Sequence, residues 1–218
     1  MKKNTIISLS LLILLTTITF QQKIIISRFN IKEINIENNL LIKNEELKKL
    51  LEPIYNKNIF FLKNKEIKEI LIRNSFVDSF DLKRKYPNTL KIKIYEKKPI
   101  AILFNKKKKF YLSEKNKLID FKNLSNVKNL PYIFGDEINF KILYIKLKKI
   151  NFPLDLIKKY MFYETNRWDI ETKDNKIIKL PIKNYTQSLE NYLKIKSKSE
   201  FKKYRVFDYR IKNQLILK

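Results

Sequence analysis

The chain opens with an uncharged stretch at residues 4–20 that is rich in Ile and Leu. Nowhere else does this Lys-rich sequence continue so far without an ionisable side chain. As a helix, the stretch would be about 25 Å long at about 1.5 Å per residue, near the lower limit for crossing a bilayer. We therefore predict a transmembrane signal anchor at residues 4–22, after a short stub at 1–3 and before a linker at 23–28.

Two other interpretations of this segment are a cleaved signal peptide and a buried helix of a soluble domain. Cleavage requires small residues after the apolar region. The chain has one Ala and one Gly, and both lie beyond residue 100. Basic residues flank both ends of the segment, but a very short N-terminus normally stays in the cytoplasm while a long domain is translocated. The pattern favours a retained anchor with the body of the chain outside the cytoplasm.

In residues 29–97, the order of apolar and polar positions predicts a small β-α-α-β-β domain. Residues 29–37 are predicted to form a strand, and Asn44 is placed to cap a helix with Glu45 and Glu46 in its first turn. A second helix is predicted to begin near Asn64. The first helix carries an apolar stripe at helical spacing, made of Leu47, Leu50, Leu51 and Ile54.

A β-hairpin closes this domain. Residues 80–85 and 90–96 are the predicted strands, and residues 86–89, Tyr-Pro-Asn-Thr, form the turn. In the second strand, apolar and polar residues alternate, which predicts one buried and one solvated face.

Residues 98–218 are predicted to form a mainly antiparallel β domain with flanking helices. Helices are expected at 139–150 and 184–196. Strands are expected at 100–104, 110–112, 117–119, 131–134, 156–164, 167–172, 176–180, 204–210 and 214–217. Asn stands at turns where Gly is common, and Asn is the residue other than Gly that best tolerates a positive φ. The fold class is thus α+β with one N-terminal transmembrane helix.

The charge is strongly basic, with 48 Lys and Arg against 22 Asp and Glu and a net charge of +26. Such a balance raises the possibility of a nucleic-acid partner. The excess is spread along the whole chain, however, together with abundant Ile, Asn, Phe and Tyr. The densest run, Lys106–Lys109, is interpreted as a solvated hairpin tip, and the alternative is a phosphate or lipid-headgroup patch.

The amino-acid composition also excludes several kinds of catalytic and metal-binding site. The chain has no Cys and no His, which excludes disulfides, thiolate metal sites and the usual general base near neutral pH. A single Gly excludes glycine-rich phosphate loops. Asp169 and Glu171 would share one face of a strand, where an exposed salt-bridging face is favoured over an acid/base or metal pair. We therefore expect no enzyme, catalytic residue, metal site or cofactor.

Several motifs resemble those of the bacterial cell division family FtsQ, also called DivIB. The β-α-α-β-β domain resembles a POTRA domain, and the rest of the chain resembles the β domain of that family. The first similarity is carried by residues 76–78, 86–90 and 96–101. The second is carried by Leu130-Pro131, Arg167-Trp168-Asp169-Ile170, residues 178–181 and Phe207-Asp208-Tyr209-Arg210.

The resemblance implies a non-enzymatic divisome scaffold of the inner membrane, of type II topology and located at the division septum. It would link early and late division proteins and recruit the coiled-coil proteins FtsB and FtsL by β-strand addition at the C-terminal edge. Other septal proteins could contact the POTRA domain. The partner-binding residues implied are Arg205, Phe207, Tyr209, Arg210, Ile211, Asn213, Leu215 and Leu217.

The same residues and the whole chain also allow other interpretations. Val206, Phe207 and Tyr209 could simply pack the sheet, and Trp168 is interpreted as a core aromatic rather than an interface anchor. For the whole chain, the alternatives are a POTRA-containing transport or outer-membrane assembly component and a basic nucleic-acid-binding protein. The basic residues themselves would then face lipid, cell-wall polymer or nucleic acid according to the compartment.

Overall fold

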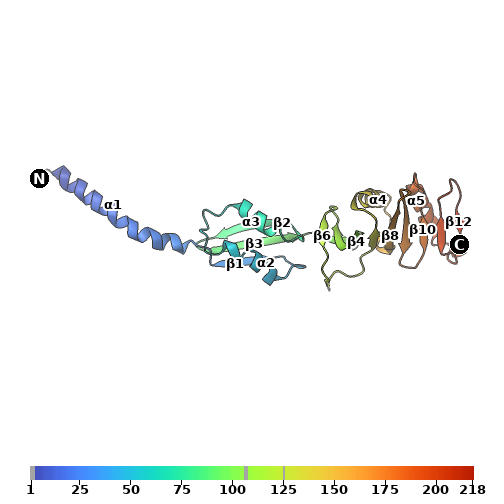
Figure 1. The fold of residues 1–218 in the computed structure, drawn as a ribbon, viewed down its shortest axis with the longest axis horizontal. Coiled ribbons are helices and arrows are strands. Elements are labelled where there is room, and N and C mark those ends of the chain that lie inside the picture. The colour runs from blue at the N-terminus through green and yellow to red at the C-terminus, as the bar shows by residue number, and fades with distance from the viewer. Residues whose placement is uncertain (1–2, 106–107, 125) are drawn as a thin grey trace. The chain divides into compact units, whose positions relative to one another are not determined.

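The computed structural model of this chain describes residues 3–105, 108–124 and 126–218 (Figure 1). These residues form two compact units, Met1–Glu96 and Lys97–Lys218. Lys106 and Lys107, half of the basic run that we assigned to a hairpin tip, lie outside the described residues. Lys108 and Lys109 begin a strand.

A helix, α1 (Lys3–Arg28), covers the predicted anchor and continues through residues 23–28, for which we predicted a linker. Its first half carries large apolar side chains that are all more than half exposed: Ile6, Ile7, Leu9, Leu11, Leu12, Ile13, Leu14 and Leu15. Within the described part of the chain, no helix is both long enough and apolar enough to span a bilayer.

The first unit contains a three-stranded sheet with the order β1-β3-β2. The central strand β3 (Thr89–Glu96) pairs in parallel with β1 (Glu33–Glu37) and antiparallel with β2 (Val77–Lys85). Two α-helices and a short 3-10 helix connect β1 to β2: α2 (Asn44–Leu50), η1 (Glu52–Ile54) and α3 (Asn64–Leu71). The predicted β-α-α-β-β order is therefore present.

Two local predictions in this unit were wrong. Asn44 does not cap α2, because the helix begins at Asn44 itself and the preceding Lys43 makes no capping hydrogen bond through its side chain. The strand predicted at 29–37 begins only at Glu33. Residues 29–31 instead bond to the segment before α3, where the Ile31 amide donates to the Lys57 carbonyl and the Ile59 amide donates to the Phe29 carbonyl.

The core of this unit lies between the sheet and its helices. Leu90, Ile92 and Ile94 of β3 are fully buried, as the alternating pattern predicted. From α3, Ile67 and Leu71 are fully buried. The apolar residues at helical spacing on α3 and those at every second position of β3 therefore form one apolar layer.

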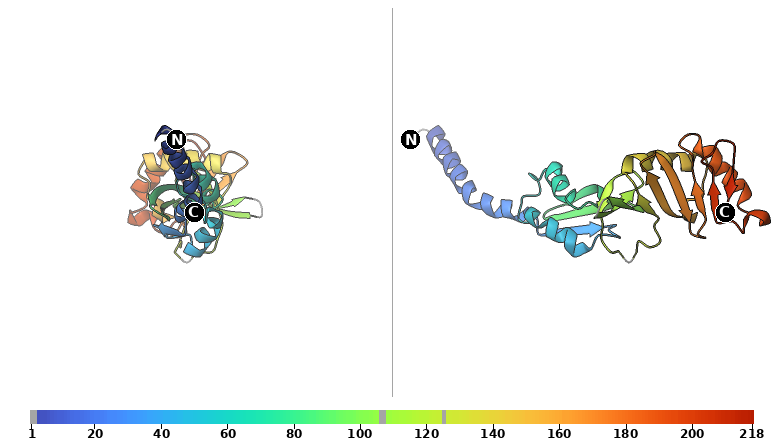
Figure 2. Two further views of the ribbon diagram at one scale, coloured as in Figure 1. Left: turned by 90° about the vertical axis from the view of Figure 1, so that its left-hand side faces the viewer. Right: turned by 45° about the vertical axis from the view of Figure 1, so that its right-hand side comes forward.

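The second unit is built on a nine-stranded sheet with the order β12-β11-β10-β9-β8-β7-β4-β5-β6. Figure 2 shows these strands following one another to the C-terminal end of the chain. The first four strands along the chain are β4 (Pro99–Asn105), β5 (Lys108–Ser113), β6 (Leu118–Asp120) and β7 (Tyr132–Phe134). The remaining five are β8 (Ile157–Tyr163), β9 (Arg167–Thr172), β10 (Ile177–Lys179), β11 (Val206–Asp208) and β12 (Ile216–Leu217).

Pairing in this sheet is more mixed than we predicted. The meander of β8, β9 and β10 is antiparallel, as expected. The pairs β4–β7, β7–β8 and β10–β11 are parallel. Helix α4 (Glu137–Lys149) connects β7 to β8, and α5 (Tyr185–Ile195) connects β10 to β11. A parallel neighbour requires such a crossover, so both predicted helices serve to return the chain to the same end of the sheet.

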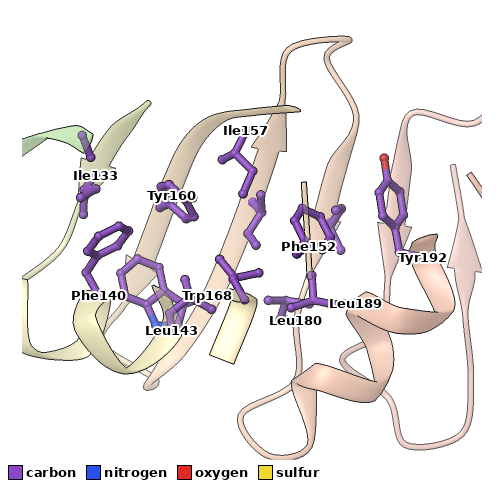
Figure 3. Packing of buried hydrophobic residues seen from close by; sticks show 14 of the residues in the cluster. Ile133, Phe140, Leu143, Phe152, Ile157, Tyr160, Trp168, Leu180, Leu189 and Tyr192 are labelled. Carbon is purple, nitrogen blue, oxygen red and sulfur yellow. The ribbon is translucent and has the colours of Figure 1, made fainter. Parts of the chain in front are cut away.

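The hydrophobic core of this unit lies on one face of the sheet, beneath α4 and α5 (Figures 1 and 3). The strand register aligns one apolar row across the sheet: Leu103, Ile133, Tyr160, Ile170, Ile178, Phe207 and Leu217. Leu143 and Leu147 of α4 and Leu189 of α5 are fully buried against this face.

Asn provides the left-handed turns of the chain. Every described residue other than Gly that has a positive φ is an Asn, nine in all, among them Asn166 and Asn175 in the meander. This result confirms the prediction that Asn replaces Gly at turns. Gly135, which follows β7, has a φ of 158°, and a Cβ at this position would also lie 2.7 Å from the Cβ of Phe162.

Candidate partner-binding edge

The C-terminal strand β12 forms one edge of the nine-stranded sheet. It pairs antiparallel with β11, with Phe207 opposite Leu217 and Asp208 opposite Ile216. The pairing is extended by Lys218, whose amide donates to the Val206 carbonyl at 3.1 Å and whose carbonyl accepts from the Val206 amide at 2.8 Å. No strand in the described part of the chain pairs with the other side of β12.

These hydrogen bonds fix which backbone groups face outward. Val206 and Lys218 exchange both of their hydrogen bonds, so the neighbouring pair Phe207 and Leu217 is a non-hydrogen-bonded pair. The N–H and C=O of Leu217 therefore point away from β11, toward the open side of the sheet. An open edge of this kind can accept a further strand.

A groove of about 810 Å³ lies beside this edge. One wall is the segment between β11 and β12, and the other is the start of α5 with the residues before it. Its lining residues are Pro181, Ile182, Lys183, Asn184, Gln187, Ser188, Asn191, Tyr209, Arg210, Ile211, Lys212, Asn213, Gln214 and Leu215. The side chains of Ile182 and Ile211 are 57% and 51% exposed, so each wall presents an apolar residue to solvent.

The structure places two of the predicted contact residues in the core. Phe207 is 1% exposed, and its ring packs edge-on against Tyr192 of α5. Tyr209 is 7% exposed, and its hydroxyl donates to Asn191 Oδ1 at 2.9 Å. Their side chains therefore hold α5 on the sheet, which was the alternative interpretation of this segment, and Tyr209 also lines the groove.

The other predicted residues are accessible to different extents. Ile211 and Asn213 are exposed, and Asn213 has a φ of 59° in the turn that precedes β12. Leu215 and Leu217 are half-buried against the core. Arg205 is exposed, and its amide donates to the Lys218 carbonyl at 2.6 Å. The structure thus gathers this set along one edge, with Ile211 as its most exposed apolar member.

Arg210 already has an acidic partner within the chain. Its Nη2 donates to Asp208 Oδ2 at 2.6 Å, and its Nε donates to Asp208 Oδ1 at 2.8 Å. The hydrogen bonds from Arg210 lower the pKa of the Asp208 carboxyl below its ordinary value. Because the Arg210 side chain is 45% exposed, it can still contact an acidic partner through its outer face.

Known proteins match both units of the chain. Residues 29–97 match the model of the FtsQ-type POTRA domain. The cell division protein FtsQ of Rickettsia conorii is 28% identical over 190 residues, which cover 85% of this chain and 71% of that protein. The cell division protein DivIB of Clostridium tetani is 31% identical over 135 residues, which cover 62% of this chain and 48% of that protein. The chain is thus similar to cell division proteins of the FtsQ/DivIB family.

The similarity to these proteins agrees with the motifs that carried the sequence resemblance. Trp168, the only Trp, is 4% exposed and packs against Phe140 and Phe162, so it is a core residue as we interpreted it. The FtsQ-type POTRA match ends at residue 97, beside the division between the two units at Glu96. The edge at β12 therefore belongs to the unit that follows the POTRA domain.

The carboxylates of β9 form ion pairs. Glu171 contacts Lys158 and Lys159, and the Asp169 carboxylate accepts from Arg167 Nη1 at 3.2 Å. Unlike the exposed face that we predicted, Asp169 is 3% exposed, and burial raises the pKa of its carboxyl above the ordinary value. Among the described residues, no cluster of acidic side chains is suited to hold a metal ion.

Sequence reasoning missed the second wall of the groove. Ile182 lies between Pro181 and Lys183, in a short connection that carries no periodic pattern. Gln187 and Asn191, one turn apart on α5, also line the groove. Only the parallel crossover through α5 brings this wall beside residues 210–215, so the local sequence gave no signal for it.

Proposed function

We propose that this protein is a non-enzymatic divisome scaffold of the FtsQ/DivIB type that recruits an FtsB/FtsL-type coiled-coil complex by β-strand addition at β12. The observation that carries this proposal is the outward-facing backbone of Leu217 beside a groove whose two walls each expose an Ile side chain. A partner strand would gain main-chain hydrogen bonds from the edge, and its alternate side chains would gain specificity from the groove.

We further propose that residues 4–22 anchor the protein in the inner membrane, with residues 1–3 in the cytoplasm and both folded units outside it, at the division septum. The support is the uncharged sequence at 4–20 within a helix of 26 residues, together with exposed Ile and Leu side chains along residues 6–15. In this arrangement, the scaffold links early and late division proteins.

The partner-binding test compares two exposed Ile residues of the same unit. Ile211→Asp places a charge in the groove, whereas Ile145→Asp does so on α4, outside the groove, where Ile145 is 55% exposed. We expect Ile211→Asp to lose capture of the FtsB/FtsL-type complex and Ile145→Asp to retain it. Equal capture by both variants, with unchanged Trp168 fluorescence, would show that the partner does not use the groove.

The strand-addition mechanism has a separate test. Leu217→Pro removes one outward N–H but none of the hydrogen bonds between β11 and β12, because proline is tolerated on an edge strand where its nitrogen faces outward. The control Leu217→Val keeps the N–H and most of the apolar side chain. We expect only the proline variant to lose capture. Retained capture would mean that side chains alone bind the partner.

Membrane topology can be tested independently of partner binding. An alkaline phosphatase fused after Lys218 is active only outside the cytoplasm, and a fluorescent tag on the N-terminus reports position in the cell. We expect active phosphatase and a band of fluorescence at midcell. Inactive phosphatase would refute the proposed orientation, and evenly spread fluorescence would argue against recruitment to the septum.

A further inference from the structure

The POTRA unit displays an aromatic cluster, defined here as Phe29, Phe60, Phe61 and Tyr86. Phe60, Phe61 and Tyr86 are 55%, 80% and 57% exposed. The Phe60 ring stacks on Tyr86 with centroids 4.9 Å apart and also lies 4.9 Å from the ring of Phe29. Phe60 and Tyr86 thus form an exposed stacked pair beside the half-buried Phe29, and Phe61 is exposed next to Phe60 in the chain. An exposed aromatic surface of this kind indicates a binding surface.

The fold holds this cluster in place. Phe60 and Phe61 lie between two buried residues, Ile59 and Leu62. Arg84 of β2 ties the loop to the sheet, since its Nε donates to the Ile59 carbonyl at 3.1 Å and its Nη2 donates to the Leu62 carbonyl at 2.7 Å. The exposed rings are therefore presented by a loop that is fixed on both sides.

The cluster lies where α1 joins the POTRA unit. Phe29 directly follows Arg28, the last residue of α1, and the Asn30 amide donates to the Ser27 carbonyl at 3.1 Å. The Phe29 carbonyl in turn accepts from the Ile59 amide at 2.9 Å. If α1 crosses the membrane, residues 23–28 continue the helix by about 9 Å beyond the proposed anchor, and this continuous chain of contacts holds the aromatic rings close to that side of the bilayer.

The charge around the cluster suits an anionic surface. The three segments that meet here are residues 28–32, 57–63 and 84–88, and they contain no Asp or Glu. They contain the basic residues Arg28, Lys32, Lys57, Lys63, Arg84 and Lys85. All of these except Arg84 are exposed, although Lys57 forms an ion pair with Glu66.

We propose that the aromatic cluster inserts into the headgroup region of the membrane and docks the POTRA unit on the bilayer, assisted by the surrounding basic residues. Aromatic side chains favour this interface, and basic residues near it are attracted by anionic lipids. A lipid surface is favoured over a protein partner because only the helical residues 23–28 separate the cluster from the proposed anchor. This inference rests on the anchoring part of the proposed function.

The test uses single cysteines in the full-length chain, which has none of its own. An environment-sensitive fluorophore is attached at Phe61→Cys and, as a control, at Leu40→Cys, where Leu40 is 78% exposed. The amides of Leu40 and Leu41 bond to Glu96, at the opposite end of β3 from the turn that contains Tyr86. The two labels are therefore separated by roughly the length of that strand, about 25 Å.

The labelled proteins are reconstituted in vesicles of phosphatidylcholine and phosphatidylglycerol that contain a lipid quencher near the glycerol level. We expect the label at residue 61 to shift to the blue and to be quenched several-fold more than the label at residue 40. Insertion of about 5–10 Å is typical of interfacial binding and would place it within reach of the quencher. We also expect stronger quenching with phosphatidylglycerol than in vesicles of phosphatidylcholine alone.

Failure of this inference is distinguishable from failure of the proposed anchor. Protein that stays in the membrane after alkaline carbonate extraction, with equal and weak quenching at both positions, would overturn the lipid contact and leave the anchor intact. A label that is exposed in vesicles but shielded in native membranes would replace the lipid with a protein partner. Release of the protein by carbonate would overturn the anchor, and the aromatic contact with it.

Discussion

The assignment of Tyr209 to the core, rather than to partner contact, leads to a quantitative prediction. Tyr209 is 7% exposed within the apolar cluster beneath α5, and its hydroxyl donates to Asn191 Oδ1 at 2.9 Å. Tyr209→Ala removes the ring and the hydrogen bond together. Tyr209→Phe removes only the hydroxyl and leaves the ring in place.

The two substitutions should lower the free energy of unfolding by very different amounts. Truncation of a large buried aromatic residue to Ala typically lowers the free energy of unfolding by about 3–5 kcal/mol, because apolar contacts are lost and a cavity remains. Loss of the hydroxyl should cost about 1 kcal/mol, because one hydrogen bond disappears and Asn191 can turn toward water at the edge of the groove. We therefore expect a loss of about 4 kcal/mol for Tyr209→Ala.

Trp168 makes the measurement specific for this unit, since it is the only Trp and is buried in the same core. With a urea dependence of about 2 kcal/mol per molar, Tyr209→Ala should lower the unfolding midpoint by about 2 M and Tyr209→Phe by about 0.5 M. Ile211→Asp, at an exposed position two residues further on, should leave the midpoint almost unchanged. An unchanged midpoint for Tyr209→Ala, combined with loss of partner capture, would refute the core assignment.

Three further predictions concern the same unit and the same fluorescence measurement. Gly135→Ala should lower the free energy of unfolding by about 1–3 kcal/mol, since its Cβ would lie 2.7 Å from that of Phe162. An unchanged free energy of unfolding would mean that Phe162 can move away from residue 135 without loss of stability. Asp208→Asn should lower the free energy of unfolding by about 1 kcal/mol at neutral pH, a value that allows for solvent screening of the half-exposed Arg210. This difference from the unsubstituted protein should vanish as the pH falls through the lowered pKa of Asp208, because only the ionised carboxyl gains from the ion pair. A difference that grew toward acid pH would contradict that sign. Asn166→Val should cost about 1–2 kcal/mol because of its φ of 56°, while Asn166→Gly should cost much less, and equal losses would contradict the backbone explanation.

Much of the local structure could be predicted from the sequence. The alternation of Leu90, Ile92 and Ile94 indicated the buried face of β3, because a two-residue period can satisfy only one face of a sheet. Asn-containing turns marked hairpins even without Gly, because Asn tolerates a positive φ at modest cost. Helix ends were less certain. Asn44 has the chemistry of a cap, but its backbone is already helical.

The partner-binding edge was predictable in location but not in detail. The motif around Phe207 and Tyr209 indicated the terminal strands, yet an apolar residue on such a strand can face either the core or a partner. That choice depends on which face of the sheet α5 covers. Helix α5 forms the crossover between the parallel strands β10 and β11, and it packs on the face that carries Phe207 and Tyr209. Ile211, just beyond the strand, was left exposed for the groove.

Sequence alone therefore determined the order of elements, the two-part organisation and the family resemblance, because these depend on local periodicity and short motifs. Tertiary structure decided which face of the C-terminal strands is buried, that β12 is one edge of the sheet, and that residues 182 and 211 face the same groove. It also brought residues 28–32, 57–63 and 84–88 to one end of the POTRA unit, through hydrogen bonds between segments far apart in the chain. Such long-range contacts leave no periodic trace in the sequence, so the surfaces that they build can be recognised only in the folded protein.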